Sequence, residues 1–187
     1  MPDVFFTADT HFFHRNILKH CPARVYADVE AMNEGLIANW NSRVRNGDTV
    51  FHCGDFAFTK DHGAISAIVK RLNGHIFLIR GNHDCDKVIN KVEGFAWVGA
   101  KYQNKFAKVD KQLVFCSHYA HRVWDHAQHG AFHVFGHSHG GLADDPTMLS
   151  CEVGVDAWNC FPVSFEELRE VMAKKVFVPV DRHGKAE

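Results

Sequence analysis

Five short apolar runs in this sequence each end in residues that can bind a metal ion. The runs are expected to be buried strands, because they are consecutive apolar residues bounded by polar turn residues. The clusters that follow them are Asp9–Thr10–His11, Gly54–Asp55, Gly81–Asn82–His83–Asp84, Ser117–His118 and Gly136–His137–Ser138–His139. Neighbouring strands end at one edge of a sheet, where α/β proteins build their sites. The five clusters therefore predict one shared metal site at that edge.

The elements around these clusters alternate between strand and helix in the first half of the chain and are mostly strand in the second half. Strands are expected at 4–8, 49–53, 75–79, 106–109, 112–116, 131–135, 151–155 and 176–180. Helices are expected at 29–44 after an Asp28 cap, at 64–72, at 87–92, and after a capping box of Ser164 and Glu167. This pattern favours an α/β layered fold over a simple doubly wound sheet. We expect one domain over 1–187, with a frayed tail at 181–187.

Composition narrows the class of protein. The 187 residues carry 21 Lys and Arg against 22 Asp and Glu, so there is no basic excess of the kind that binds long nucleic acids. No apolar run reaches membrane-spanning length, and the first residues do not resemble a signal peptide. We therefore expect a cytoplasmic protein with no membrane contact. The six cysteines are scattered, which indicates neither a disulfide framework nor a cysteine-rich zinc site.

Each cluster has a simpler explanation when it is taken alone. The clusters at Asp9, Asp55 and Asn82 could be turns, because Asp, Asn and Gly favour turn backbone. A lone His118 could be a buried core histidine. The pair at 137 and 139 points one way on an extended segment, but surface histidine pairs are common. The presence of all five clusters in one chain, which contains 15 histidines, favours the metal site.

In this order the clusters resemble the motifs of the calcineurin-like metallophosphoesterase superfamily: Asp-x-His, Gly-Asp, Gly-Asn-His-Asp/Glu, a lone His and Gly-His-x-His. The motifs span residues 9–139, and the resemblance reaches 154–159 and 162–164. The chain is similar to the small, capless bacterial and phage branch. It implies two mixed β-sheets packed as a sandwich flanked by helices. It also implies an enzyme that hydrolyses phosphate esters. One departure is Phe58, where many relatives have an acidic residue.

The resemblance implies two divalent ions bound by seven residues. The first ion would take Asp9, His11, Asp55 and His139, and the second would take Asp55, Asn82, His118 and His137. Asp55 would thus bridge the two ions. Mixed imidazole and carboxylate ligands suit Mn, Fe, Zn or Ni, and we expect Mn. A hydroxide between the ions would attack phosphorus, while His83, oriented by Asp84, would protonate the leaving group.

The substrate is expected to be a small phosphate ester of the nucleotide type. Arg15 and Arg122 follow the first and fourth motifs and could each hold a phosphate oxygen, although both could be solvated loop residues. Short connections leave no room for a cap, which favours a phosphodiesterase. A phosphomonoesterase of the same fold and a non-catalytic metal-binding scaffold remain alternatives. A metallo-β-lactamase is excluded, because Gly141 and Leu142 stand where it needs Asp and His.

Overall fold

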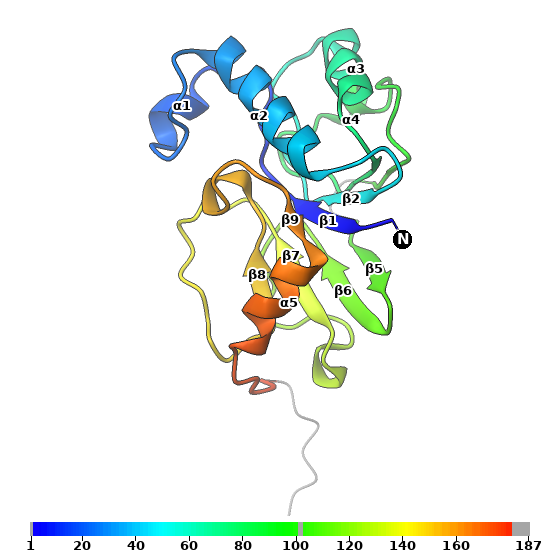
Figure 1. The fold of residues 1–187 in the computed structure, drawn as a ribbon, viewed down its shortest axis with the longest axis vertical. Helices are drawn as coiled ribbons and strands as arrows, with labels where there is room; N and C mark the ends of the chain where they lie inside the picture. Colours follow the sequence, from blue (N-terminus) through cyan, green and yellow to red (C-terminus); the bar gives the residue numbers. More distant parts are fainter. Residues whose placement is uncertain (1, 101–102, 181–187) are drawn as a thin grey trace, which may run out of the picture.

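The computed structural model consists of two mixed β-sheets packed face to face, and it describes residues 2–100 and 103–180 (Figure 1). The first sheet has the order β4-β3-β2-β1-β9. Its strands are β1 (Val4–Thr7), β2 (Thr49–His52), β3 (His75–Leu78), β4 (Trp97–Val98) and β9 (Val163–Ser164). Only β9 runs antiparallel to its neighbour.

The second sheet has the order β5-β6-β7-β8. Its strands are β5 (Lys105–Val109), β6 (Gln112–Cys116), β7 (Phe132–Phe135) and β8 (Ser150–Glu152). The hairpin of β5 and β6 is antiparallel, whereas β6, β7 and β8 are parallel. The two mixed sheets confirm the predicted α/β sandwich.

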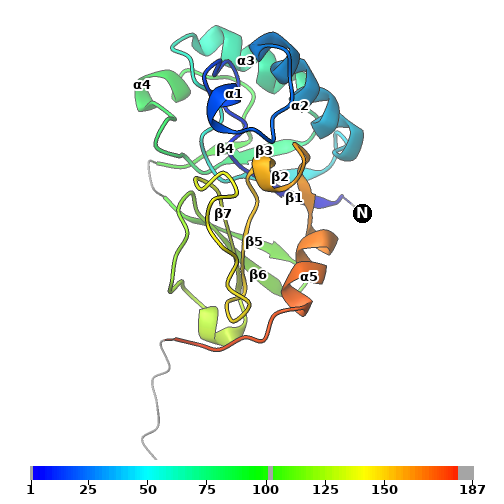
Figure 2. The same cartoon turned by 90° about the vertical axis from the view of Figure 1, so that its left-hand side faces the viewer.

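Most helices lie on the outer face of the first sheet (Figures 1 and 2). They are α1 (Ile17–His20), α2 (Val29–Arg43), α3 (His62–Arg71) and α4 (Asp86–Ile89). The Asp28 side chain caps α2 by accepting a hydrogen bond from the Ala31 N–H group, as predicted. The last helix, α5 (Phe165–Ala173), begins at the predicted capping box and packs against β8 and β9. The outer face of the second sheet is covered by a loop with a one-turn helix, η1 (Ala127–His129).

The hydrophobic core has two layers, one on each face of the first sheet. Phe5 contributes to the layer under the helices, and the next residue, Phe6, contributes to the layer between the sheets. This alternation is expected, because successive side chains of a strand point to opposite faces. Since both faces of β1 and β2 are buried, their sequences read as continuous apolar runs rather than as alternating ones.

Two of the expected strands differ from the structure. Residues 176–180 form no strand, although the N–H groups of Val176 and Val178 donate to the carbonyls of Pro146 and Thr147. The side chain of Val176 is 75% exposed, so this segment buries too little apolar surface to form part of a sheet. The expected strand at 151–155 ends at Glu152 and is followed by a one-turn helix, η2 (Val155–Ala157). The predicted frayed tail lies outside the described residues.

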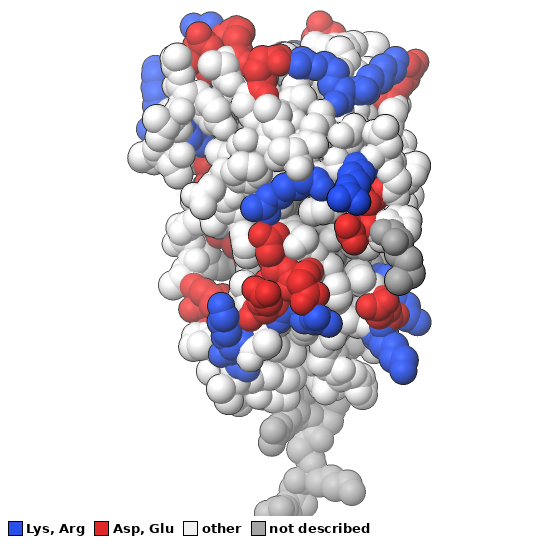
Figure 3. Space-filling model, in the orientation of Figure 1, with Lys and Arg blue, Asp and Glu red and all other residues white. Residues whose placement is uncertain are grey.

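The surface shows mixed charge. On the face drawn in Figure 3, basic and acidic side chains lie near one another. Surface ion pairs of the chain include Arg43–Glu167 and Arg169–Glu166. Within residues 2–100 and 103–180, no helix has the length and apolar character needed to cross a membrane.

Candidate metal centre

The loops that carry the predicted ligands lie against one another at one end of the sandwich. The Asp9 N–H group donates to the Gly54 carbonyl at 2.9 Å, which holds the loops after β1 and β2 side by side. The His11 N–H group does the same with the Asp55 carbonyl at 3.0 Å. The second sheet joins them there, because the His137 N–H group donates to Asp9 Oδ2 at 2.8 Å. The ligands predicted from separate strand ends thus belong to one site formed by both sheets.

Asp9, His11 and His139 form the first ligand group. Each offers one ligand atom, and these atoms lie within 4.8 Å of one another. Asp9 is 0% exposed and His11 is 1% exposed. Among the described residues, Asp9 Oδ1 and His11 Nε2 are buried without a hydrogen-bond partner. A buried polar atom without a partner is costly, so these two atoms fit a bound cation.

Asp55, His118 and His137 form the second ligand group, with ligand atoms again within 4.8 Å of one another. The His118 Nδ1 atom lies 2.8 Å from the Cys53 carbonyl and must carry its proton there, because a carbonyl only accepts. Its Nε2 atom then has a free lone pair, and it lies 2.8 Å from Asn82 Oδ1. Two acceptor atoms this close fit two ligands of one cation.

Asp55 lies between the two groups. Its Oδ2 atom is 3.6 Å from Nε2 of His11 and 3.6 Å from Nε2 of His118. Its other oxygen, Oδ1, accepts a hydrogen bond from the His83 N–H group at 2.8 Å. One carboxylate therefore faces a ligand atom of each group.

The electrostatics of the protein alone favour neutral side chains in this site. Burial raises the pKa of the Asp9 carboxyl, and the neighbouring Asp55 raises it further. Burial also raises the pKa of Asp55, and it lowers the pKa of His11 to about 2 and that of His118 to about 4. Neutral imidazole is the form that binds metal, and a cation offsets the repulsion between buried carboxylates. The donor set thus fits divalent ions.

The backbone is strained where the ligands lie. Five of the seven predicted ligands have a positive φ, a conformation uncommon outside glycine. These are Asp9 at 57°, His11 at 48°, Asp55 at 56°, His137 at 73° and His139 at 50°. Such strain persists where the surrounding structure enforces it, and it clusters at functional sites.

Two motif glycines leave room for the carboxylates. A Cβ atom on Gly81 would collide with the Asp55 carboxylate, and a Cβ atom on Gly136 would lie 2.6 Å from Asp9 Oδ2. Glycine at these positions allows the backbone to approach the ligands closely.

A buried ion pair that the sequence did not reveal holds the first group. Asp156 Oδ2 lies 2.7 Å from His139 Nδ1, and Arg24 binds both oxygens of Asp156 at 2.7 and 2.8 Å. Arg24 also donates to the carbonyl of Asp9 at 2.5 Å. Burial alone would raise the pKa of Asp156, but its hydrogen bonds from Arg24 and His139 hold that pKa well below its usual range. With Nδ1 engaged by Asp156, His139 presents Nε2 for metal binding.

The sequence contained only a partial signal for this pair. Asp156 falls in the stretch 154–159, to which the resemblance extended without a role for any residue. Arg24 is 15 positions after Asp9 and belongs to no motif. Arg24 lies in the loop before α2, and it contacts Asp156 and Asp9 only in the folded chain.

Asp84 has a different role from the one predicted. It is 1% exposed, and its carboxylate accepts hydrogen bonds from the N–H groups of Asp55, Phe56 and Gly81 at 2.8, 3.0 and 2.9 Å. Burial raises its pKa to about 6. Asp84 thus joins the loops after β2 and β3, and both of its oxygens are used by the backbone rather than by the His83 ring.

His83 lies at the exposed mouth of the first group. Its ring centroid is 5.4 Å from that of His11 and 5.3 Å from that of Phe58. Phe58, the departure from the family pattern, stacks on His14 at 4.1 Å. The Nδ1 atom of His14 lies 3.3 Å from that of His11, so His14 and Phe58 support the His11 ring where an acidic residue is usual.

The two predicted phosphate-binding arginines lie in different segments, after the first and the fourth motif. Arg15 is exposed and directly follows His14. Arg122 is exposed too, and it lines a pocket of about 560 Å³ beside the second sheet. Contact of either side chain with a substrate stays a prediction.

Comparison with known proteins identifies relatives over almost the whole chain. No protein-family model matches. The uncharacterized protein MJ1445 of Methanocaldococcus jannaschii is 31% identical over 180 residues, which cover 93% of each chain. The Gene 66 protein of Mycobacterium phage L5 is 26% identical over 204 residues, covering 92% of this chain and 95% of the phage protein.

A solved structure shares the fold. The protein of unknown function AQ665 from Aquifex aeolicus gives a TM-score of 0.69 with 21% identity, over 91% of this chain and all of that one. The phosphoesterase Yfce from E. coli gives a lower TM-score of 0.46 with 19% identity, over 81% of this chain and 78% of that one. At this identity the Aquifex structure supports the two-sheet fold and not an activity.

Proposed function

Because this chain belongs to the calcineurin-like metallophosphoesterase superfamily, we propose that it is a hydrolase that cleaves phosphodiesters with two divalent metal ions. The membership follows from the five ordered motifs, from their meeting in one site, and from the two-sheet fold. The number of ions, the preference for diesters and the choice of Mn are our proposals.

The position of Asp55 carries this proposal. One of its oxygens lies 3.6 Å from a ligand nitrogen of each group. On one side are the unpaired atoms Asp9 Oδ1 and His11 Nε2, and on the other are the facing acceptors of His118 and Asn82. A carboxylate shared between two ligand groups lowers the repulsion between two cations.

The chain contributes ligands, a proton donor and an open site. Two divalent ions bound here would supply the positive charge that holds phosphoryl oxygens and lowers the pKa of the attacking water. The leaving oxygen needs a proton as its bond to phosphorus breaks, and we assign that proton to the His83 ring. The His83 backbone is anchored to Asp55, which keeps the ring near the centre. His83 and His137 are exposed, so bulky esters can approach, which favours diesters.

The test uses metal-free protein refilled separately with Mn, Fe, Zn, Ni or Mg. We expect Mn-loaded protein to hydrolyse bis(4-nitrophenyl) phosphate with a higher kcat/KM than 4-nitrophenyl phosphate. A preference for the monoester would make the protein a phosphomonoesterase of the same fold. No hydrolysis of either ester with any of the metals would favour a non-catalytic scaffold.

A further inference from the structure

A pocket of about 560 Å³ opens beside the metal centre, and several residues that line it follow the candidate ligands closely in the sequence. Gly140 directly follows the ligand His139, and Ala120 comes two residues after the ligand His118. Ala157 directly follows Asp156, which holds His139. The volume is in the range of small-molecule sites, roughly 300–1,000 Å³. A molecule bound by its phosphate at the metals can therefore reach into this pocket.

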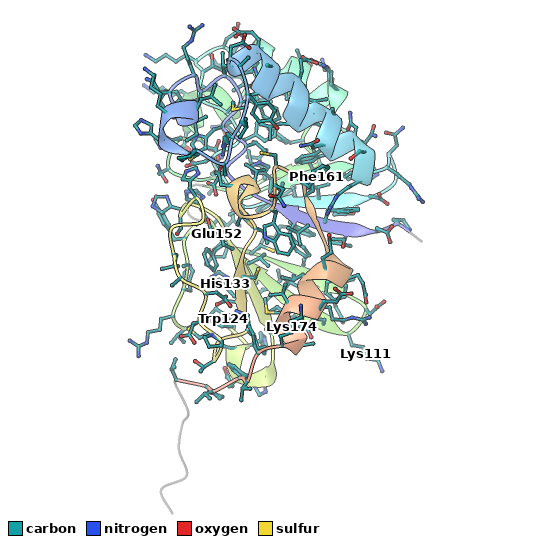
Figure 4. All side chains as sticks on the ribbon, turned by 60° about the vertical axis from the view of Figure 1, so that its left-hand side comes forward. Lys111, Trp124, His133, Glu152, Phe161 and Lys174 are labelled. Atoms are coloured by element: carbon teal, nitrogen blue, oxygen red, sulfur yellow. The ribbon has the colours of Figure 1, made fainter. Side chains whose placement is uncertain are left out.

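The pocket lies on the outer face of the second sheet. Val134 of β7 points into the core between the sheets, so its neighbour Phe135 points outwards, into the pocket wall. Glu152 of β8 lines the pocket and accepts a hydrogen bond from the Gly140 N–H group at 2.9 Å, and Figure 4 shows it with His133 of the neighbouring strand β7. The pocket thus lies on the surface of the second sheet, next to the segment that follows His139.

The pocket has an apolar lining with aromatic and flexible side chains. Phe135, Leu142, Met148 and Trp158 all line it, and Leu142 is 50% exposed. The Trp158 indole N–H group donates to the Glu152 carbonyl at 2.7 Å, which fixes the ring in place. A fixed indole and a phenyl ring offer flat surfaces on which another ring can pack.

The charges at the pocket favour a neutral occupant. Arg122 is the one Lys or Arg among the lining residues. Asp145 and Glu152 also line the pocket, while the carboxylate of Asp144 is paired with Lys175 at 2.5 Å. A second anionic group on the substrate would meet these carboxylates, so the pocket does not fit a polyphosphate or a polynucleotide strand.

We propose that this pocket binds the organic group of the ester, and that it selects substrates whose phosphate carries a flat, neutral aromatic group, such as an aryl or nucleoside group. The proposal rests on the function proposed above and specifies the substrate of the same site. Burial of an aromatic group against these side chains should raise affinity by roughly tenfold or more.

The experiment measures the binding of two probes that cannot be hydrolysed. Calorimetry of Mn-loaded protein gives the Kd of methylphosphonate and of phenylphosphonate, which share the anionic head and differ in the organic group. We expect phenylphosphonate to bind about tenfold more tightly. Leu142→Ser should reduce this ratio to about threefold. Val123→Ser is the matched control, because Val123 is 46% exposed on a neighbouring loop and does not line the pocket, so the ratio should not change.

Equal affinity for the two phosphonates, or no binding of either, would overturn the proposal. A ratio that Leu142→Ser leaves unchanged would also overturn it. Hydrolysis of bis(4-nitrophenyl) phosphate, measured on the same sample, tests the proposed function separately. Hydrolysis without a phenyl preference rejects the pocket alone, and a phenyl preference without hydrolysis rejects the phosphodiesterase alone.

Discussion

The two ligand groups differ in how the protein holds them. In the first, Asp9 and His11 are almost completely buried, and the Arg24–Asp156 ion pair fixes His139. In the second, His118 is buried and bonded to the backbone, but His137 is exposed and Asn82 is half-buried. The first group is built into the core, and the second opens to solvent.

This difference predicts different affinities for the two proposed ions. Ligands that are fixed by further hydrogen bonds bind metal more tightly, because less ordering is needed on binding. We therefore expect the first group to retain its ion and the second to exchange its ion more readily. Asp55 links a rigid site to an open one, so changes to it should affect both.

The largest expected effect comes from Asp55→Asn. The amide removes the charge that both groups share, so activity should be nearly abolished and both ions should bind weakly. Elemental analysis after refilling with Mn measures this. Cys53→Ser, two residues earlier on the chain and outside both groups, should keep its metal. Near-normal turnover with both ions present in Asp55→Asn would show that Asp55 is not shared.

His83→Asn should have the next largest effect, and on turnover rather than on metal content. General acid assistance is typically worth about 10²–10⁴-fold, so kcat should fall by this range for esters with poor leaving groups. Esters of 4-nitrophenol need little help from a proton donor and should lose much less. Steady-state kinetics on both kinds of ester decides, and an equal loss for both would exclude the general-acid role.

Asp156→Asn should distinguish the two groups. Changes to residues that support metal ligands typically weaken metal binding about 10–100-fold. The loss should fall on the first ion, because Asp156 contacts His139 and its ion-pair partner Arg24 contacts Asp9. Metal titration measures it, with the exposed Asp125→Asn as control. Equal weakening of both ions would contradict separate support for the first group.

The sequence pointed to the candidate ligands but not to the residues that support them. Candidate ligands such as Asp55 and His118 follow apolar runs, and runs buried on both faces are visible in sequence. Arg24 and Asp156 are 132 residues apart and meet only in the folded chain, so no local pattern revealed them. Asp84 was misjudged for the same reason, because two of its three backbone N–H partners, those of Asp55 and Phe56, lie in another loop.

The pattern of apolar residues in the sequence also failed to predict short strands correctly. β9 has two residues and completes the first sheet only because Val163 pairs with Phe6 of β1. The valines of 176–180 suggested a strand, yet all three are at least half exposed. Tertiary contacts, rather than the propensity of the residues, decided both cases.

The smallest effect on the metal centre is expected from His133, which lies in the second sheet away from both groups. It is fully buried, its Nδ1 atom donates to the Phe115 carbonyl at 3.1 Å, and its Nε2 atom accepts from the His121 N–H group at 3.0 Å. Burial lowers its pKa to about 4. The unfolded chain has a His pKa near 6.5, so it binds more protons than the folded chain between these values.

The contribution of the neutral His133 ring to the free energy of unfolding is therefore fully present above pH ~6.5, and it is lost as the pH falls towards 4. The loss amounts to about 3 kcal/mol. Urea unfolding of metal-free protein between pH 7 and 4.5 should give a shallower pH dependence for His133→Phe than for the unmodified chain. Identical slopes would show that His133 is not held neutral. After refilling with metal, both proteins should contain the same amount of it.

The shared role of Asp55 is tested most directly by adding Mn to metal-free protein while recording electron paramagnetic resonance. We expect two ions to bind per chain, the first more tightly than the second. The second ion should convert the signal of an isolated ion into that of a coupled pair. Saturation at one ion per chain, or two ions with independent signals, would contradict a centre joined by Asp55.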